Sequence, residues 1–175
     1  MIRKANGFAL IDLLFVCAIV SILCTIALPR MLMARQSAGA ASAIGSLRAV
    51  SSAQLTYALT CGGGFYAPNL TTLGRPPVSS HEAFISPNLS TSDTVIRSGY
   101  RIELEATAYA LAPATCNGLG VGEAAQGYKA GAGPIDPSGV RYFALNANNQ
   151  IYEHTGAIYP TMPELGEPSV GRTLR

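Results

Sequence analysis

Asp12 is the residue whose position most clearly calls for a specific chemical role. It is the single charged side chain between Phe8 and Leu28, in a run that is otherwise almost entirely apolar. As a helix this run would be roughly 31 Å long, close to the ~30 Å hydrocarbon core of a bilayer. A buried aspartate costs about 2.5–3.5 kcal/mol on membrane-insertion scales, so it requires a compensating partner. We therefore expect Asp12 to have a compensating role or partner.

The residues before this run predict its orientation and a processing site. Arg3 and Lys4 precede Gly7 without any acid, and two cations before a long apolar span predict a cytoplasmic N-terminus and an exported remainder. A secretory signal is cut after its apolar region. Here the plausible cut follows Gly7, before the run, so the mature chain would begin at Phe8 and keep its anchor. The alternative is an ordinary signal anchor with a stray aspartate.

The rest of the chain offers little for catalysis. His81 and His154 are single and far apart, without metal-ligand spacing, and Glu103 and Glu105 would share the solvated face of one strand. The sequence contains no Gly-x-Ser-x-Gly elbow, phosphate loop or His-Glu-x-x-His motif. We predict that the protein is not an enzyme and needs no cofactor. A membrane-anchored enzyme remains the less favoured alternative.

One weak candidate for a metal site involves oxygen ligands near the predicted sheet. Asp136 together with the amide oxygen of Asn146 or Asn148 could contribute to a calcium loop. One acid with two amides is a poor ligand set, so we predict no metal site.

The four cysteines form two pairs of different kinds. Cys17 and Cys24 lie seven residues apart in the apolar run, about 10.5 Å along a helix, which is too far for a disulfide. Cys61 and Cys116 lie in the exported part, where thiols are oxidised, and we predict a bridge between them. The alternative is two free buried thiols.

The charge balance argues against a general affinity for nucleic acid. Lys and Arg outnumber Asp and Glu by 12 to 10, but the excess lies in the leader and just after the apolar run. Beyond Arg35 the chain is close to neutral. A local cluster formed by Arg97, Arg101 and Tyr100 is the alternative that would suit a DNA receptor.

The helical signal continues well beyond the apolar run. Pro29 predicts a kink, because proline lacks an N–H and crowds the preceding turn, yet helix-compatible sequence resumes at Met31. Three glycines, 62–64, must end the helix. We predict that one side of its second half is apolar and faces the sheet or neighbouring helices. The residues expected there are Ala40, Ala41, Ile44, Leu47, Ser51, Leu55, Ala58 and Leu59.

Residues 65–98 read as a long connection, which in a small domain is normally packed or functional. Within it, 69–74 and 80–85 could each form a short helical turn.

Strands are expected in the second half of the chain. Apolar and polar residues alternate over 100–107, and a weaker, glycine-rich candidate covers 126–132. Residues 140–145 and 150–154 flank a turn and read as a hairpin. We predict an α+β fold in which a long N-terminal helix packs on an antiparallel sheet of three or four strands. The expected order is leader 1–7, helix 8–59 (membrane-spanning over 8–28), connection 60–98, sheet 99–159 and extended tail 160–175.

The N-terminal motif resembles that of type IV pilins and type II secretion pseudopilins. It consists of Gly7, Phe8, Asp12, the uninterrupted apolar run and Pro29, all at the spacing typical of that family. The resemblance covers about the first 30 residues. Two positions depart from the pattern: the family's usual acid is glutamate rather than aspartate, and Ser21 stands where a glycine is frequent, which bears on whether the helix melts there during assembly.

The resemblance implies a role as a structural subunit. In that family a prepilin peptidase cleaves after the residue matching Gly7 and the new first residue, here Phe8, is N-methylated. The acid matching Asp12 pairs with the terminal amine of a neighbouring subunit, and the proline matches Pro29.

The partners implied are copies of the chain and other pilins in a helical filament, the peptidase, the assembly platform with its ATPase, and the bacterial inner membrane. The exported domain would be periplasmic and then part of an extracellular pilus or a periplasmic pseudopilus. The alternatives are a secretion pseudopilin, or a minor pilin that acts as a DNA or surface receptor at the filament tip.

Overall fold

The computed structural model describes residues 10–136 and 139–174. The chain divides into two compact units, Met1–Ser37 and Ala38–Arg175. Helix α1 (Leu10–Thr60) contributes to both units, and we describe each unit by itself.

The described part of the first unit consists of helix α1 alone. Its described side chains, 10–37, are all exposed, so none of them is packed against another described part of the chain. Pro29 lies inside the helix without ending it. The proline cannot donate to the carbonyl of Thr25, so the helix is weakened at this point.

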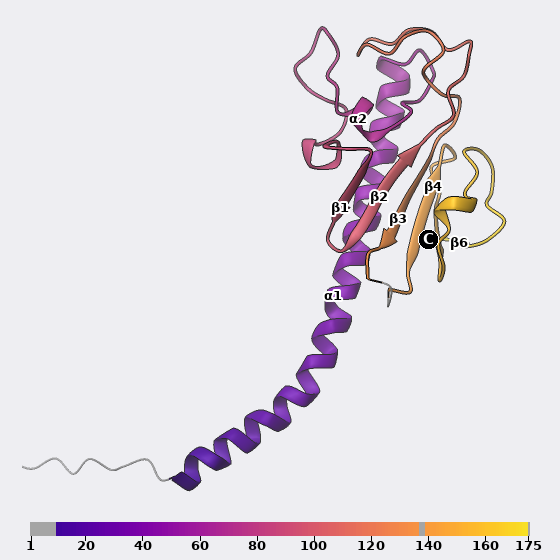
Figure 1. The fold of residues 1–175 in the computed structure, drawn as a ribbon. Coiled ribbons are helices and arrows are strands. Elements are labelled where there is room, and N and C mark those ends of the chain that lie inside the picture. Colours follow the sequence, from indigo (N-terminus) through magenta and orange to yellow (C-terminus); the bar gives the residue numbers. More distant parts are fainter. Residues whose placement is uncertain (1–9, 137–138, 175) are drawn as a thin grey trace, which may run out of the picture. The chain divides into compact units, whose positions relative to one another are not determined.

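The second unit contains a six-stranded antiparallel sheet in which neighbours in sequence are neighbours in space. Figure 1 shows the sheet lying across the C-terminal part of α1. The strands are β1 (Thr94–Arg97), β2 (Tyr100–Glu105), β3 (Lys129–Pro134), β4 (Tyr142–Asn146), β5 (Ile151–His154) and β6 (Arg172–Thr173). The α+β class with one long N-terminal helix and an antiparallel sheet is thereby confirmed.

The predicted number of three or four strands was wrong, because both edge strands were missed. Strand β1 lies at the end of the expected connection and joins β2 through the turn Ser98-Gly99, where both residues have positive φ. Such a turn suits the twist of a two-residue hairpin. Strand β6, with only two residues, lies in the expected tail and pairs with Tyr152 and Glu153 of β5.

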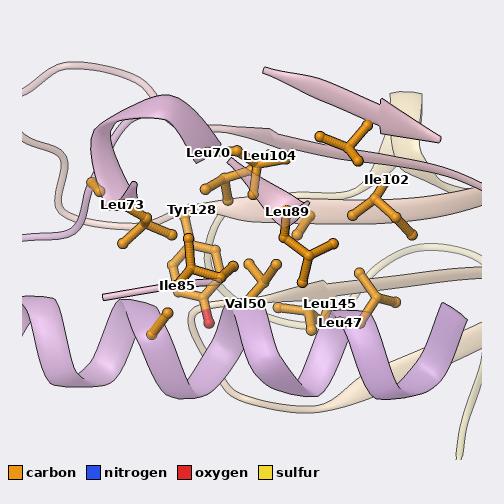
Figure 2. Packing of buried hydrophobic residues seen from close by; sticks show 14 of the residues in the cluster. Leu47, Val50, Leu70, Leu73, Ile85, Leu89, Ile102, Leu104, Tyr128 and Leu145 are labelled. Carbon is orange, nitrogen blue, oxygen red and sulfur yellow. The ribbon is translucent and has the colours of Figure 1, made fainter. Parts of the chain in front are cut away.

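The main core lies between α1 and one face of the sheet (Figure 2). Leu47, Val50 and Tyr57 of the helix are fully buried there. They share one core cluster with side chains of three central strands, Ile102, Leu104, Ala130, Ala132, Phe143 and Leu145. At Gly39 the helix approaches the β1–β2 turn so closely that a Cβ would lie 2.8 Å from the carbonyl oxygen of Ser98.

The expected core face of the helix was only partly right. Leu55 and Leu59 are 45% and 76% exposed, whereas Val50, Gln54 and Tyr57 are buried. Gln54 faces the core because its amide pairs with the backbone of Ala67, with hydrogen bonds of 2.8 and 2.9 Å. A polar residue that is fully satisfied in this way can be buried at low cost, which the hydropathy pattern does not reveal.

The connection between helix and sheet is packed rather than loose. The first expected helical turn forms as α2 (Leu70–Leu73), with Asn69 as its N-cap. The second, expected at 80–85, is absent from the described structure, which instead has a 3₁₀ turn, η1, at Pro87–Leu89. The segment before η1 inserts Phe84 and Ile85 into the core, and the Phe84 ring packs edge-on against that of Tyr57.

The opposite face of the sheet is partly covered by the C-terminal segment. Ala144, Tyr152, Ile158 and Met162 form a small second cluster, around the 3₁₀ turn η2 (Tyr159–Thr161). Asn146 holds this segment by donating hydrogen bonds to the carbonyl oxygens of Pro163 and Gly166, at 3.1 and 2.6 Å.

Candidate assembly segment and the surface of the folded domain

Asp12 lies in the first described turn of α1, and its side chain is exposed among exposed apolar residues. It forms no hydrogen bond or ion pair with any other residue that the structure describes. The acid is therefore available to a partner outside this set. Gly7 and Phe8, the predicted cleavage and methylation residues, lie outside the described residues.

The two hydroxyl side chains of the apolar run are satisfied within the helix. Ser21 donates to the carbonyl of Cys17 at 2.8 Å, and Thr25 donates to the carbonyl of Ile22 at 2.7 Å. In hydrocarbon such internal bonds remove the cost of an unpaired hydroxyl. The run can therefore be surrounded by lipid or by other helices with Asp12 as its single costly group. Cys17 and Cys24 are free, as expected for residues too far apart to bridge.

The first unit exposes a continuous apolar surface. The helix is long and apolar enough to cross a membrane, and none of its most apolar window is buried. A surface of this size needs a covering, because single apolar residues on a protein surface are ordinary but contiguous patches are not. A membrane span and a signal sequence both satisfy this description. The large exposed side chains include Leu10, Ile11, Leu13, Leu14, Phe15, Val16, Ile19, Val20, Ile22, Leu23, Ile26 and Leu28.

The predicted Cys61–Cys116 disulfide is confirmed, with the two Cα atoms 4.9 Å apart. It joins the residue after α1 to the loop between β2 and β3, and the amide of Cys116 also donates to the carbonyl of Cys61 at 3.3 Å. Nearby, buried Asn117 donates to the carbonyl of Thr72 at 2.8 Å, and its side-chain oxygen lies 3.4 Å from the Tyr57 hydroxyl. Burial raises the pKa of Tyr57, so its hydroxyl stays protonated and can donate this bond. The end of the helix is thus tied to two loops.

The weak calcium candidates are not brought together. Asp136 follows the end of β3, whereas Asn146 pairs with Lys129 at the start of that strand. The two residues therefore lie at opposite ends of the sheet. No group of three or more His, Cys, Asp or Glu residues suitable for a metal occurs within 10–136 and 139–174.

Arg97, Tyr100 and Arg101, the cluster considered for DNA binding, do not share one exposed surface. Tyr100 is buried against the helix, with its ring 6.0 Å from that of Phe143, while Arg97 and Arg101 are exposed. Burial raises the pKa of Tyr100. The guanidinium of Arg101 lies 3.8 Å from the carboxylate of Glu103. The three residues therefore do not form an aromatic, cationic surface.

The sheet face away from α1 carries a hollow that the sequence did not indicate. Alternate residues of a strand point to opposite faces, so with Ala132 and Phe143 in the core, the flanking Gly131, Gly133 and Tyr142 line the other side. The hollow has a volume of about 330 Å³. We call it the outer trough and define it by Arg101, Glu103, Gly131, Gly133, Tyr142 and Tyr159.

The walls of the outer trough depend on its glycine floor. A Cβ on Gly131 would lie 2.6–2.7 Å from atoms of the Tyr159 side chain, so this ring lies directly against the strand. A Cβ on Gly133 would be 3.5 Å from the Tyr142 ring, in ordinary contact. The spacing Gly131-x-Gly133 on one face of a strand was the available signal, since glycine in a strand often marks a close approach.

Glu153 and two arginines form a charged cluster at the β6 edge of the sheet. Glu153 is 8% exposed and accepts from Arg141 at 2.6 Å and from Arg172 at 3.3 Å. The hydrogen bond from Arg141, followed by the weaker effect of Arg172, holds the pKa of Glu153 below its ordinary value. Because Arg172 belongs to β6, this carboxylate fastens the last strand to β5.

The turn between β4 and β5 is held to the helix. Asn149, which has a φ of 60°, accepts from the hydroxyl of Ser51 at 2.6 Å and from that of Tyr128 at 3.3 Å. Burial raises the pKa of Tyr128 to about 12, so its hydroxyl remains a donor.

Comparison with known proteins gives no match. No family model fits the chain, and no curated protein or solved structure is significantly similar to it.

Proposed function

We propose that this chain is a structural subunit of a type IV pilus or pilus-like filament, assembled through its N-terminal helix. The observation that carries the proposal is the combination of an exposed apolar helix with one acid, Asp12, that has no partner among the described residues. A plain membrane anchor has no use for this acid, whereas an assembly that supplies a cation at the same depth does.

The proposed mechanism begins with cleavage after Gly7 and methylation of Phe8. The mature chain then waits in the inner membrane with its sheet domain outside, and the assembly machinery moves it into the filament. There the apolar run exchanges lipid for neighbouring helices, and Asp12 pairs with the terminal amine of Phe8 on an adjoining subunit. The hydroxyls of Ser21 and Thr25, bonded within their own helix, allow this exchange without new unpaired groups.

A type II secretion pseudopilin would use the same helix and the same pairing, and we retain it as the alternative within this proposal. The minor-pilin DNA receptor is less favoured, because Tyr100 is buried and Arg101 lies beside Glu103.

The test replaces Asp12 and measures filament incorporation. Removing one partner of a buried ion pair costs about 3–5 kcal/mol, because the other charge is left unpaired. Asp12→Ala should therefore remain in the membrane at normal abundance while disappearing from the sheared filament fraction. Asp12→Glu, which keeps the charge, is the matched control and should be incorporated. Normal incorporation of Asp12→Ala would refute the role given to this residue.

A further inference from the structure

We propose that the outer trough binds neutral carbohydrate, taking one sugar ring at the end of an oligosaccharide. This inference goes beyond the filament proposal and does not depend on it, because every residue of the trough lies between Arg101 and Pro160 in the second unit.

The shape of the trough suits a ring held between two walls. Arg101 is directly opposite Gly133 in the sheet register, and Glu103 is opposite Gly131. Tyr142 begins the next strand, and its ring is in contact range of a Cβ placed on Gly133. Arg101 and Tyr142 thus belong to the two strands that flank β3, with Gly133 between them. The hollow of about 330 Å³ has room for one sugar ring, whose C–H face can pack on a tyrosine ring.

The charges of the trough favour a neutral ligand. Arg101 and Glu103 lie 3.8 Å apart and compensate each other, and Lys129 beside the trough is paired with Glu105 at 3.4 Å. A phosphate approaching Arg101 would meet the Glu103 carboxylate. A guanidinium and a carboxylate side by side instead offer donors and acceptors together, which matches adjacent sugar hydroxyls.

The aromatic wall formed by Tyr159 is fixed before any ligand arrives. Its ring lies on Gly131, the Lys129 ammonium lies 5.3 Å from the ring centroid, and its hydroxyl is 3.5 Å from Glu105. Burial, with a further contribution from Glu105, raises the pKa of Tyr159, so the phenol is protonated at all physiological pH values. A preorganised wall reduces the ordering cost of binding.

The experiment uses the full-length chain in detergent and neutral oligosaccharides of glucose, galactose and N-acetylglucosamine. Backbone amide NMR shifts are recorded as each sugar is added. We expect saturable shifts centred on Gly131 and Gly133 with at least one of the sugars. Affinity should be weak for a single ring, because the trough is open on one side.

Two pairs of variants make the test specific. Gly133→Val fills the floor of the trough and should abolish binding. A Cβ there makes only ordinary contact, and the amide spectrum of the variant without sugar checks that the two added methyl groups leave the fold intact. Gly45→Val is the matched control on an open helix surface and should bind normally. Arg101→Ala should weaken binding about tenfold, as expected for lost hydrogen bonds to a charged group. Arg97→Ala removes the same charge from strand β1 and should have no effect.

Three results would overturn the proposal. One is the absence of shifts with every sugar, and another is sugar binding that Gly133→Val leaves unchanged. The third is binding of a single-stranded oligonucleotide, tested in place of sugar, in the absence of any sugar binding. In that case Gly133→Val would abolish the binding of the oligonucleotide. None of these results bears on filament assembly, which the Asp12 variants test separately.

Discussion

Gly131 is a residue of the outer sheet face that leaves no room for a side chain. A Cβ at this position would lie 2.6–2.7 Å from atoms of the Tyr159 side chain, and one of these is the Cβ of Tyr159. A small rotation of the tyrosine ring therefore cannot relieve the clash. Gly133, two residues later on the same face, has 3.5 Å of space. The two glycines look equivalent in the sequence and differ only through what the C-terminal segment places above them.

Gly131→Ala should therefore destabilise the protein by about 1–3 kcal/mol, the usual cost of overpacking. The loss in the free energy of unfolding is measured by urea unfolding of the full-length chain. The transition is monitored through the near-UV circular dichroism of its tyrosines. Gly133→Ala is the matched control and should be neutral or slightly stabilising, because alanine restricts the unfolded chain more than glycine does. Equal stabilities of the two variants would show that Tyr159 does not pack on Gly131.

Glu153 makes the last strand sensitive to acid. Its pKa is lowered in the folded protein, so its contribution to stability is fully present above its ordinary pKa of 4.5 and is lost as the pH falls through the lowered value. Glu153→Gln should cost about 1 kcal/mol at neutral pH, a modest amount because both arginines are partly exposed. When the free energy of unfolding in urea is measured at several pH values, the values for the variant and the wild type should become equal well below pH 4.5. A difference that is independent of pH would contradict this role.

At the scale of elements, the disulfide joins helix α1 to the loop between β2 and β3. Cys61 and Cys116 are separated by 55 residues, for which the loop-entropy relation gives about 4 kcal/mol. The double variant Cys61→Ser/Cys116→Ser should lose about that much stability, measured by urea unfolding without reductant. Adding reductant should destabilise the wild type to a similar extent, because Cys116 is exposed, and should leave the double variant unchanged. Equal stability of the two proteins without reductant would be inconsistent with this estimate.

The elements differ in how far the sequence could predict them. The alternation in β2 and the hairpin of β4 and β5 are local signals, and each strand formed where expected. Strand β1 had a usable signal, the Ser98-Gly99 turn before Tyr100, which the length of the connection obscured. Strand β6 has no local signal, because two residues become a strand only through pairing with β5 and through Arg172 reaching Glu153.

The same distinction applies to the surfaces that could carry function. Asp12 stands out in the sequence without any knowledge of the fold, because a charge inside an apolar run is unusual. The outer trough combines Arg101, Gly133, Tyr142 and Tyr159, which come from three strands and a C-terminal turn. Only the sheet register brings them together. The spacing Gly131-x-Gly133 could therefore suggest a close approach to the strand, but not which residues surround it.

At the scale of the whole molecule, the two units have opposite relations to their surroundings. The second unit buries its own core, whereas the first leaves a long apolar surface that no other described residue covers. On our proposal, lipid covers that surface before assembly and neighbouring helices cover it afterwards. The folded domain would then remain outside, with its sheet available to other molecules.

The most direct test of the proposed function is the mass and N-terminal sequence of the chain taken from cells. Intact-mass and N-terminal peptide analysis would be performed on the protein from membranes and from sheared surface material. We predict a chain that begins at Phe8 and carries one added methyl group, and its presence in the sheared material would favour a surface pilus over a pseudopilus. A chain that still begins at Met1 in cells with an active prepilin peptidase would contradict the proposal and indicate a simple membrane anchor.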